Sequence, residues 1–136
     1  GNDDAKWPVQ LNGYHPTLTI SNGTFDVIDQ GIWIETLAGQ YHLNENITGG
    51  IIQTKGFFTC FGNDTDFNPD GGEVRLYGSS SSNCRMSGTG NHFYNLRIMK
   101  SGGAVVKNSI QTNIKNTLNI QTGAFHDMGN PVNVGQ

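Results

Sequence analysis

Acidic and amide side chains alternate along one stretch of the chain, "NDTDFNPDGGE", at positions 63–73. Side chains with hard oxygen ligands stand at every second position, as they do in calcium-binding loops, and they are Asp64, Asp66, Asn68 and Asp70. The stretch departs from an EF-hand loop where Pro69 replaces the sixth-position glycine and Arg75 replaces the twelfth-position glutamate. Two interpretations follow: a calcium site, or a solvated corner made of Asx turns and a Pro-Asp-Gly turn.

Two cysteines, Cys60 in "FFTCF" and Cys84 in "NCRM", stand 24 positions apart. Each shares a strand face with a large apolar residue two positions away, Phe58 in one case and Met86 in the other. If both faces point inward in neighbouring coils, the thiols lie within reach of a disulfide bond. The alternative is two buried free thiols that pack as small apolar side chains.

Aromatic side chains are the candidates for ligand binding. Trp33 stands between two isoleucines, so it should point outward where they point inward. An exposed tryptophan with Tyr41 or Tyr77 nearby could stack on a sugar ring. The alternative is that Trp33 packs beneath the N-terminal segment, around Trp7 or Tyr14.

No set of residues suggests catalysis. The sequence contains no G-x-S-x-G nucleophile motif and no histidine pair at metal-binding spacing. Glycoside hydrolysis requires two carboxylates held across one groove, whereas the acids here cluster between Asp64 and Glu73 or lie scattered. We therefore predict a non-enzymatic protein with no cofactor apart from the calcium considered above, and a polysaccharide lyase or hydrolase is the alternative.

The composition is typical of a folded all-β chain. Of 136 residues, 35% are hydrophobic and 14% charged, with a net charge of -3 and 19 glycines. Glycine suits the turns between short strands, and recurring large apolar residues exclude a disordered polyelectrolyte. The Lys and Arg residues number 8 and are scattered, so they do not form the basic patch of a nucleic-acid-binding protein. No apolar run approaches the roughly 18 residues of a membrane span.

Strand-like triplets with apolar first and third residues recur along the chain. They are Leu18-Thr-Ile20, Tyr41-His-Leu43, Val74-Arg-Leu76, Leu96-Arg-Ile98 and Leu118-Asn-Ile120. With Phe58 as a missing member, the segment from Leu18 to Leu118 divides into five coils averaging roughly 20 residues, a period typical of solenoids. Residues 18–34 also align without a gap on residues 118–134. The pattern predicts an all-β fold, a right-handed parallel β-helix (solenoid) of about six coils of roughly 20 residues.

The two ends of the chain differ in character. We expect residues 1–17 to form an N-terminal cap segment, because an open β-helix end exposes backbone and core. Residues 18–136 then form the parallel β-helix, whose last strand ends in mid-pattern and could continue in a longer chain.

The residues from about Phe67 onward carry a family resemblance. The matching positions lie in "GTGNHFYNLRIMKSGG" at 88–103 and in "LNIQTGAF" at 118–125. The chain resembles the β-helical repeat regions of large secreted and surface adhesin-like proteins of Bacteroidetes-type bacteria. The resemblance implies a structural or adhesive segment of a secreted or cell-surface protein. It supplies no catalytic residues.

The expected partners follow from this context. They are surface glycans or neighbouring domains of a longer chain, with no nucleic acid and no membrane-spanning segment. The alternative function is a carbohydrate-binding or polysaccharide-processing β-helix that uses outward aromatic side chains and the stretch from Asp64 to Asp70.

Overall fold

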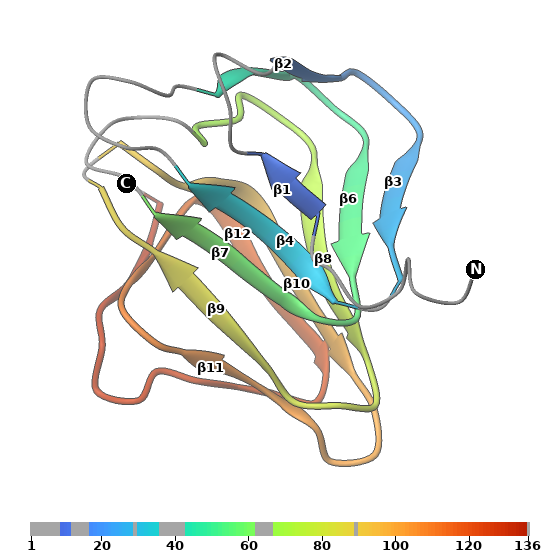
Figure 1. Ribbon diagram of the computed structural model, residues 1–136. Helices are drawn as coiled ribbons and strands as arrows, with labels where there is room; N and C mark the ends of the chain where they lie inside the picture. The colour runs from blue at the N-terminus through green and yellow to red at the C-terminus, as the bar shows by residue number, and fades with distance from the viewer. Residues whose placement is uncertain are drawn as a thin grey trace.

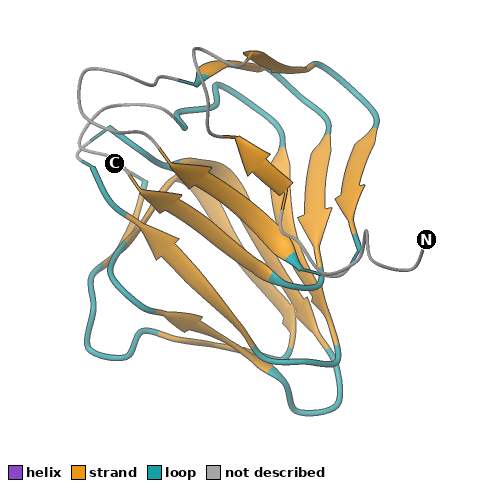
Figure 2. Cartoon of the chain, in the orientation of Figure 1, coloured by secondary structure: helices purple, strands orange, loops and turns teal. Residues whose placement is uncertain are grey.

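Short runs rich in Ile, Val, Phe and Thr, separated by Gly, Asn and Ser, form the strands of the protein. The computed structural model describes residues 9–11, 17–28, 30–35, 43–61, 67–88 and 90–135, without the side chains of 9–11 and 35. Within these ranges the regular elements are β-strands, and no helix is present. Figure 2 shows the strands joined by short loops.

The strands form two parallel sheets and one parallel pair. Sheet 1 contains, in spatial order, β1 (Val9–Leu11), β4 (Gly31–Glu35), β7 (Phe57–Phe61), β9 (Ser82–Met86), β11 (Val105–Asn108) and β13 (Ala124–His126). Sheet 2 contains β14 (Val132–Val134), β12 (Thr112–Thr122), β10 (Phe93–Lys100), β8 (Glu73–Gly78), β6 (Ile51–Thr54) and β3 (Thr24–Val27). The pair consists of β2 (Thr17–Ile20) and β5 (Asn44–Ile47).

Consecutive strands lie on different faces, so the chain winds around a common axis. Strands β3, β4 and β5 belong to sheet 2, sheet 1 and the pair respectively, and β6 returns to sheet 2 beside β3. Figure 1 shows β4, β7, β9 and β11 stacked on the face toward the viewer, with β10 and β12 behind them. The predicted fold class, an all-β parallel β-helix, is confirmed.

Inward side chains stack from coil to coil on sheet 2. Ile98 pairs in register with Leu76 on one side and Ile120 on the other. Leu96 pairs in the same way with Val74 and Leu118. The stacking predicted for these three triplets is therefore confirmed.

Three phenylalanine rings fill the centre of the coil stack. Phe58, Phe67 and Phe93 are fully buried, and their ring centroids lie 4.9 to 6.0 Å apart in tilted and edge-on arrangements. These are favourable geometries for aromatic pairs. Phe58 is thus a core residue, but it lies on sheet 1. It is therefore not the missing member of the series of triplets that stacks on sheet 2.

The coils are longer and fewer than the sequence period predicts. On sheet 2, Phe25 pairs with Ile52, which is 27 positions later, and Ile52 pairs with Val74, which is 22 positions later. The structure therefore has about four turns, not six. Similar apolar triplets occur on more than one face of each coil, so counting triplets overestimates the number of coils.

The ungapped overlay of residues 18–34 on 118–134 is also wrong in register. Leu18 lies on β2 in the two-stranded pair, whereas Leu118 lies on β12 in sheet 2. Both copies carry the same spacing of apolar residues, but they occupy different faces. Local alternation fixes which side chains point inward, and only long-range pairing fixes the face.

The predicted cap segment lies partly in the sheet. Residues 1–8 and 12–16 lie outside the described residues, but Val9–Leu11 forms β1, which pairs in parallel with β4. Capping of the first coil stays a prediction.

Close coil packing requires glycine at the start of β4. Gly31 has a φ of 117°, which L side chains rarely adopt. A Cβ placed there would collide with the backbone nitrogen and carbonyl oxygen of Phe57 on the next coil. The asparagines serve a different role, because Asn113 donates to the carbonyl oxygen of Asn91 at 3.0 Å and Asn133 donates to Asn113 Oδ1 at 2.9 Å.

Alanine substitutions in the column of Leu76, Ile98 and Ile120 should show how much the stacked side chains stabilise the protein. Ile98 is fully buried, whereas Ile120 in the same column is 47% exposed on the last coil. We expect Ile98→Ala to lower the free energy of unfolding by about 3 kcal/mol. The matched Ile120→Ala should cost less than about 1 kcal/mol. Urea denaturation measures both, and equal losses would contradict the column.

Candidate functional site

The outer face of sheet 1 carries the candidate site. Ile32 and Ile34 are buried, so Trp33 between them points outward as predicted and is half-buried. Trp33 pairs in register with Thr59 on β7, and Thr59 pairs with Arg85 on β9. Three successive coils therefore place one outward side chain each in a single row.

Two phenylalanines flank this row. Phe58 and Cys60 are buried, so the alternation of "FFTCF" turns Phe57 and Phe61 to the outer face. Their ring centroids lie 6.3 and 5.9 Å from that of Trp33, both in edge-on geometry. Sequence reasoning missed these two rings, although the same alternation that identified Trp33 could have found them.

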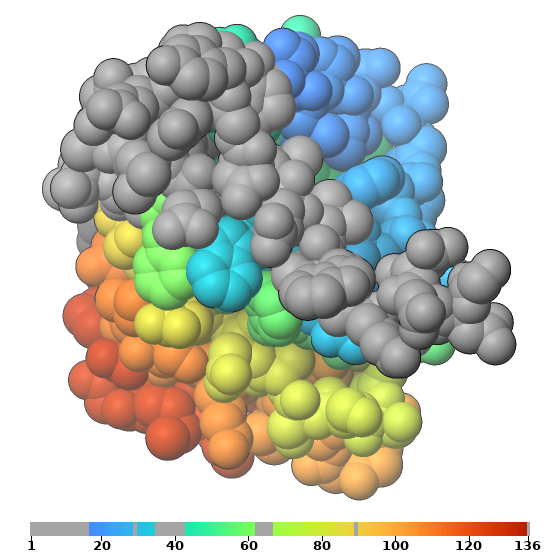
Figure 3. Space-filling view, in the orientation of Figure 1, coloured from blue at the N-terminus to red at the C-terminus, as the bar shows by residue number. Residues whose placement is uncertain are grey.

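The rings and the neighbouring polar side chains line an open pocket. Its lining residues are Trp33, Phe57, Thr59, Phe61, Asn83 and Arg85. Its cavity volume is about 130 Å³, and the pocket is open to solvent on one side. Figure 3 shows this face of the molecule, where cyan atoms of β4 adjoin green atoms of β7 and yellow atoms of β9.

Hydrogen-bond donors in the pocket lack partners. Trp33 Nε1 and Arg85 Nε are buried and form no hydrogen bond. The Arg85 guanidinium carbon lies 4.5 Å from the centroid of the Phe61 ring, a cation–π contact. Among the described residues, the one other buried side-chain polar atom without a partner is Ser82 Oγ, also on sheet 1. An unpaired buried donor destabilises the protein unless a ligand or water accepts its hydrogen.

Of the two tyrosines predicted to accompany Trp33, the one that the structure describes, Tyr77, does not join it. Tyr77 lies on β8 in sheet 2, where its hydroxyl donates to the Asp26 carboxylate at 2.8 Å. The ammonium of Lys55 lies 5.9 Å from the centroid of the Tyr77 ring. Tyr41 lies outside the described residues. Trp33 and Tyr77 thus belong to different sheets and form no common platform.

The predicted calcium stretch is described only in part. Asp64 and Asp66 lie outside the described residues, while Asn68 and Asp70 are exposed. The Asp70 carboxylate accepts a hydrogen bond from Lys115 Nζ at 3.3 Å. No three His, Cys, Asp or Glu side chains of the described ranges lie together as metal ligands. Calcium binding at this stretch stays a prediction.

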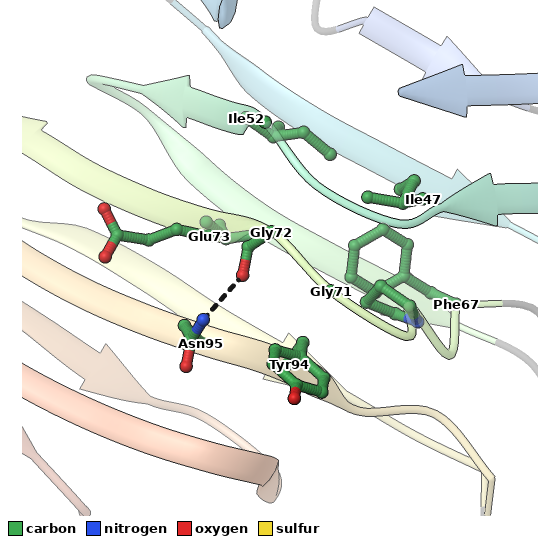
Figure 4. Close-up of a pocket in the computed structure, with 11 residues that line it drawn as sticks. Ile47, Ile52, Phe67, Gly71, Gly72, Glu73, Tyr94 and Asn95 are labelled. Carbon is green, nitrogen blue, oxygen red and sulfur yellow. Dashed lines mark hydrogen bonds between the residues drawn. The ribbon is translucent and has the colours of Figure 1, made fainter. Parts of the chain in front are cut away.

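A hollow beside this stretch is too small for a ligand. Figure 4 shows it between the corner after β5 and strands β8 and β10, with Asn95 Nδ2 donating to the carbonyl oxygen of Gly72 at 2.9 Å. The cavity volume is about 10 Å³, which holds roughly one water molecule. Nearby, burial raises the pKa of Glu45, and the Asp70 charge acts in the same direction.

Both cysteines are buried free thiols, so the disulfide alternative does not hold in this structure. Cys84 pairs in register with Phe58, and Cys60 pairs with Met86. Residues of β7 and β9 that lie side by side are 26 positions apart in the sequence. The two cysteines are only 24 positions apart, so they are offset by two residues along the strands. Burial raises the pKa of the Cys84 thiol to about 12.

One lysine lies inside the protein. Lys100 is fully buried, and its ammonium donates to the carbonyl oxygens of Lys55 at 2.8 Å and Tyr77 at 2.7 Å. Burial lowers the pKa of Lys100 to about 8. The amine of Lys100 thus joins its own coil to two backbone carbonyl groups of neighbouring coils. We assign Lys100 a structural role on this ground.

Comparisons with known proteins identify no relative. No family model matches the chain, and no curated protein or solved structure is significantly similar to it. Within the described ranges, no helix has the length and apolar character needed to cross a bilayer.

The buried thiols should be unreactive in the native state. Burial and the raised pKa keep Cys84 protonated and inaccessible, and Cys60 is equally buried. We expect an aromatic disulfide reagent to modify both thiols only after unfolding in denaturant. The intact mass should not change on reduction, and a gain of two hydrogens would contradict the free thiols.

Stability should rise with pH because of Lys100. Its pKa is about 8 in the folded state against 10.5 for the unperturbed amine, so the unfolded state binds more protons between these values. Below pH 8 the buried Lys100 amine is charged, and the destabilisation of the folded state is at its full value. As pH rises from 8 toward 10.5, the amine loses its proton in the folded state and this destabilisation is relieved.

A variant without the amine tests this dependence. The free energy of unfolding of the wild type relative to Lys100→Met should rise by up to about 3 kcal/mol across this range. Urea denaturation at several pH values measures it, with exposed Lys107→Met as the control. A constant difference between wild type and Lys100→Met would refute the effect.

Proposed function

We propose that the protein is a rigid, non-enzymatic β-helix that binds carbohydrate on the outer face of sheet 1. The observation that carries the proposal is the pocket in which Trp33, Phe57 and Phe61 surround unpaired hydrogen-bond donors. Small-molecule sites combine apolar and aromatic walls with a few placed polar groups. A sugar ring has an apolar face that suits the aromatic rings and hydroxyl oxygens that suit the donors.

The scaffold supports such a role by its rigidity. Trp33, Thr59 and Arg85 stand on β4, β7 and β9, which are hydrogen-bonded side by side and anchored by buried core residues. A preorganised site loses little conformational entropy on binding. The protein would therefore present the pocket on a stiff surface.

The state of the described carboxylates supports binding without catalysis. Glu73 is paired with Arg75 and Arg97, and Asp26 accepts hydrogen bonds from Tyr77 and Gln53. The described lining of the pocket contains no carboxylate. A glycosidase would need two of them across the bound sugar.

The proposed setting is the surface of a cell. The resemblance to adhesin-like repeat regions favours a secreted or surface-anchored protein of bacterial origin, in which the β-helix is an adhesive segment. Surface glycans would then be the ligands, and neighbouring domains of a longer chain would be further partners.

A glycan array with two matched variants tests the proposal. We expect the wild type to bind a set of glycans and Trp33→Ala to weaken that binding at least about tenfold, since a buried aromatic anchor contributes about 2 kcal/mol or more. Tyr77→Ala removes an aromatic residue from sheet 2 and should leave binding unchanged. No binding by the wild type, or equal binding by Trp33→Ala, would refute the proposal.

A further inference from the structure

We propose that the carbohydrate bound on sheet 1 is acidic, with a carboxylate or sulfate group that pairs with Arg85. This inference rests on the proposed function and adds the chemical class of the ligand. The geometry that points to it is the placement of an unpaired guanidinium in the wall of an aromatic pocket.

The three arginines of the chain differ in their partners. Arg75 and Arg97 both pair with the Glu73 carboxylate on the outer face of sheet 2. Arg85 has no ion pair or hydrogen bond with the described residues, and its contact is the ring of Phe61. The ring holds the guanidinium in place, so its donors are oriented before a ligand arrives.

The cost of covering Arg85 favours an anion. The Phe61 ring contacts Trp33 on β4 and Arg85 on β9, so a sugar that stacks on these rings removes water from the neighbouring guanidinium. If the sugar is neutral, the charged guanidinium loses its water and gains only hydroxyl groups as hydrogen-bond acceptors. Burying a charge in this way is unfavourable. A carboxylate or sulfate matches the fork of guanidinium donors and forms charge-assisted hydrogen bonds.

The neighbouring strands extend the positive character of this face. Asn83 of the pocket pairs in register with Lys107 on β11, and Lys107 pairs with His126 on β13. Lys107 is exposed, and among the described residues it has no carboxylate partner. Lys107 thus lies one strand on from Arg85 and two residues along it, so an acidic glycan that runs obliquely over strands about 4.8 Å apart would meet Arg85 and then Lys107.

Glycans that differ only in charge provide the test. The probes are an oligogalacturonate and its methyl ester, and a sulfated galactan oligosaccharide and its desulfated form, with dissociation constants measured by calorimetry. We expect at least one acidic form to bind about tenfold or more tightly than its neutral partner, as for a hydrogen-bonded charge. The preferred pair identifies carboxylate or sulfate as the group that is bound.

Variants assign the preference to Arg85. Arg85→Gln should reduce the affinity for the acidic form to the affinity for the neutral form. The control Arg97→Gln removes the same formal charge on sheet 2 and should change neither of the two affinities. The preference should weaken as ionic strength rises.

Two results would overturn the inference, and they are distinguishable. Equal binding of acidic and neutral forms, still lost in Trp33→Ala, would refute the acidic ligand and leave the carbohydrate site intact. No binding of any of the four probes, together with an empty glycan array, would refute both proposals.

Discussion

Backbone hydrogen bonding between parallel coils is the constraint on which the rest of this structure depends. Each strand inside a sheet pairs with the strand one coil before and the strand one coil after, so the register decides which side chain lies above which. Leu76, Ile98 and Ile120 form an inward column because of this register. Trp33, Thr59 and Arg85 form an outward row for the same reason. The pocket is therefore produced by the same pairing that builds the core.

Polar groups are treated differently in the interior and on this outer face. Fully buried Lys100, Asn91 and Asn108 all hydrogen-bond to groups on neighbouring coils. Within the described residues, the buried side-chain atoms without partners are confined to β4 and β9 of sheet 1. Two of these three atoms, Trp33 Nε1 and Arg85 Nε, belong to residues that line the surface pocket. Departures of this kind from local consistency are expected at functional sites.

Alternation along single strands made much of this structure predictable. It gave the all-β solenoid, the stacked triplets at Val74, Leu96 and Leu118, and the outward direction of Trp33. It could not give the coil length, because corners between strands vary in length without changing the alternation. The overlay of residues 18–34 on 118–134 failed for this reason.

Coil length also determines which outward side chains meet. Ile32 pairs with Phe58 and Phe58 with Cys84, a step of 26 positions in both cases, whereas Ile52 and Val74 on sheet 2 are 22 positions apart. The equal steps on sheet 1 place Trp33, Thr59 and Arg85 in one row and leave Cys60 beside Met86 instead of Cys84. A two-residue change in one corner would keep inward residues inward but would shift the row. The pocket is thus more sensitive to corner length than the core, and it is specified by long-range register that no single strand contains.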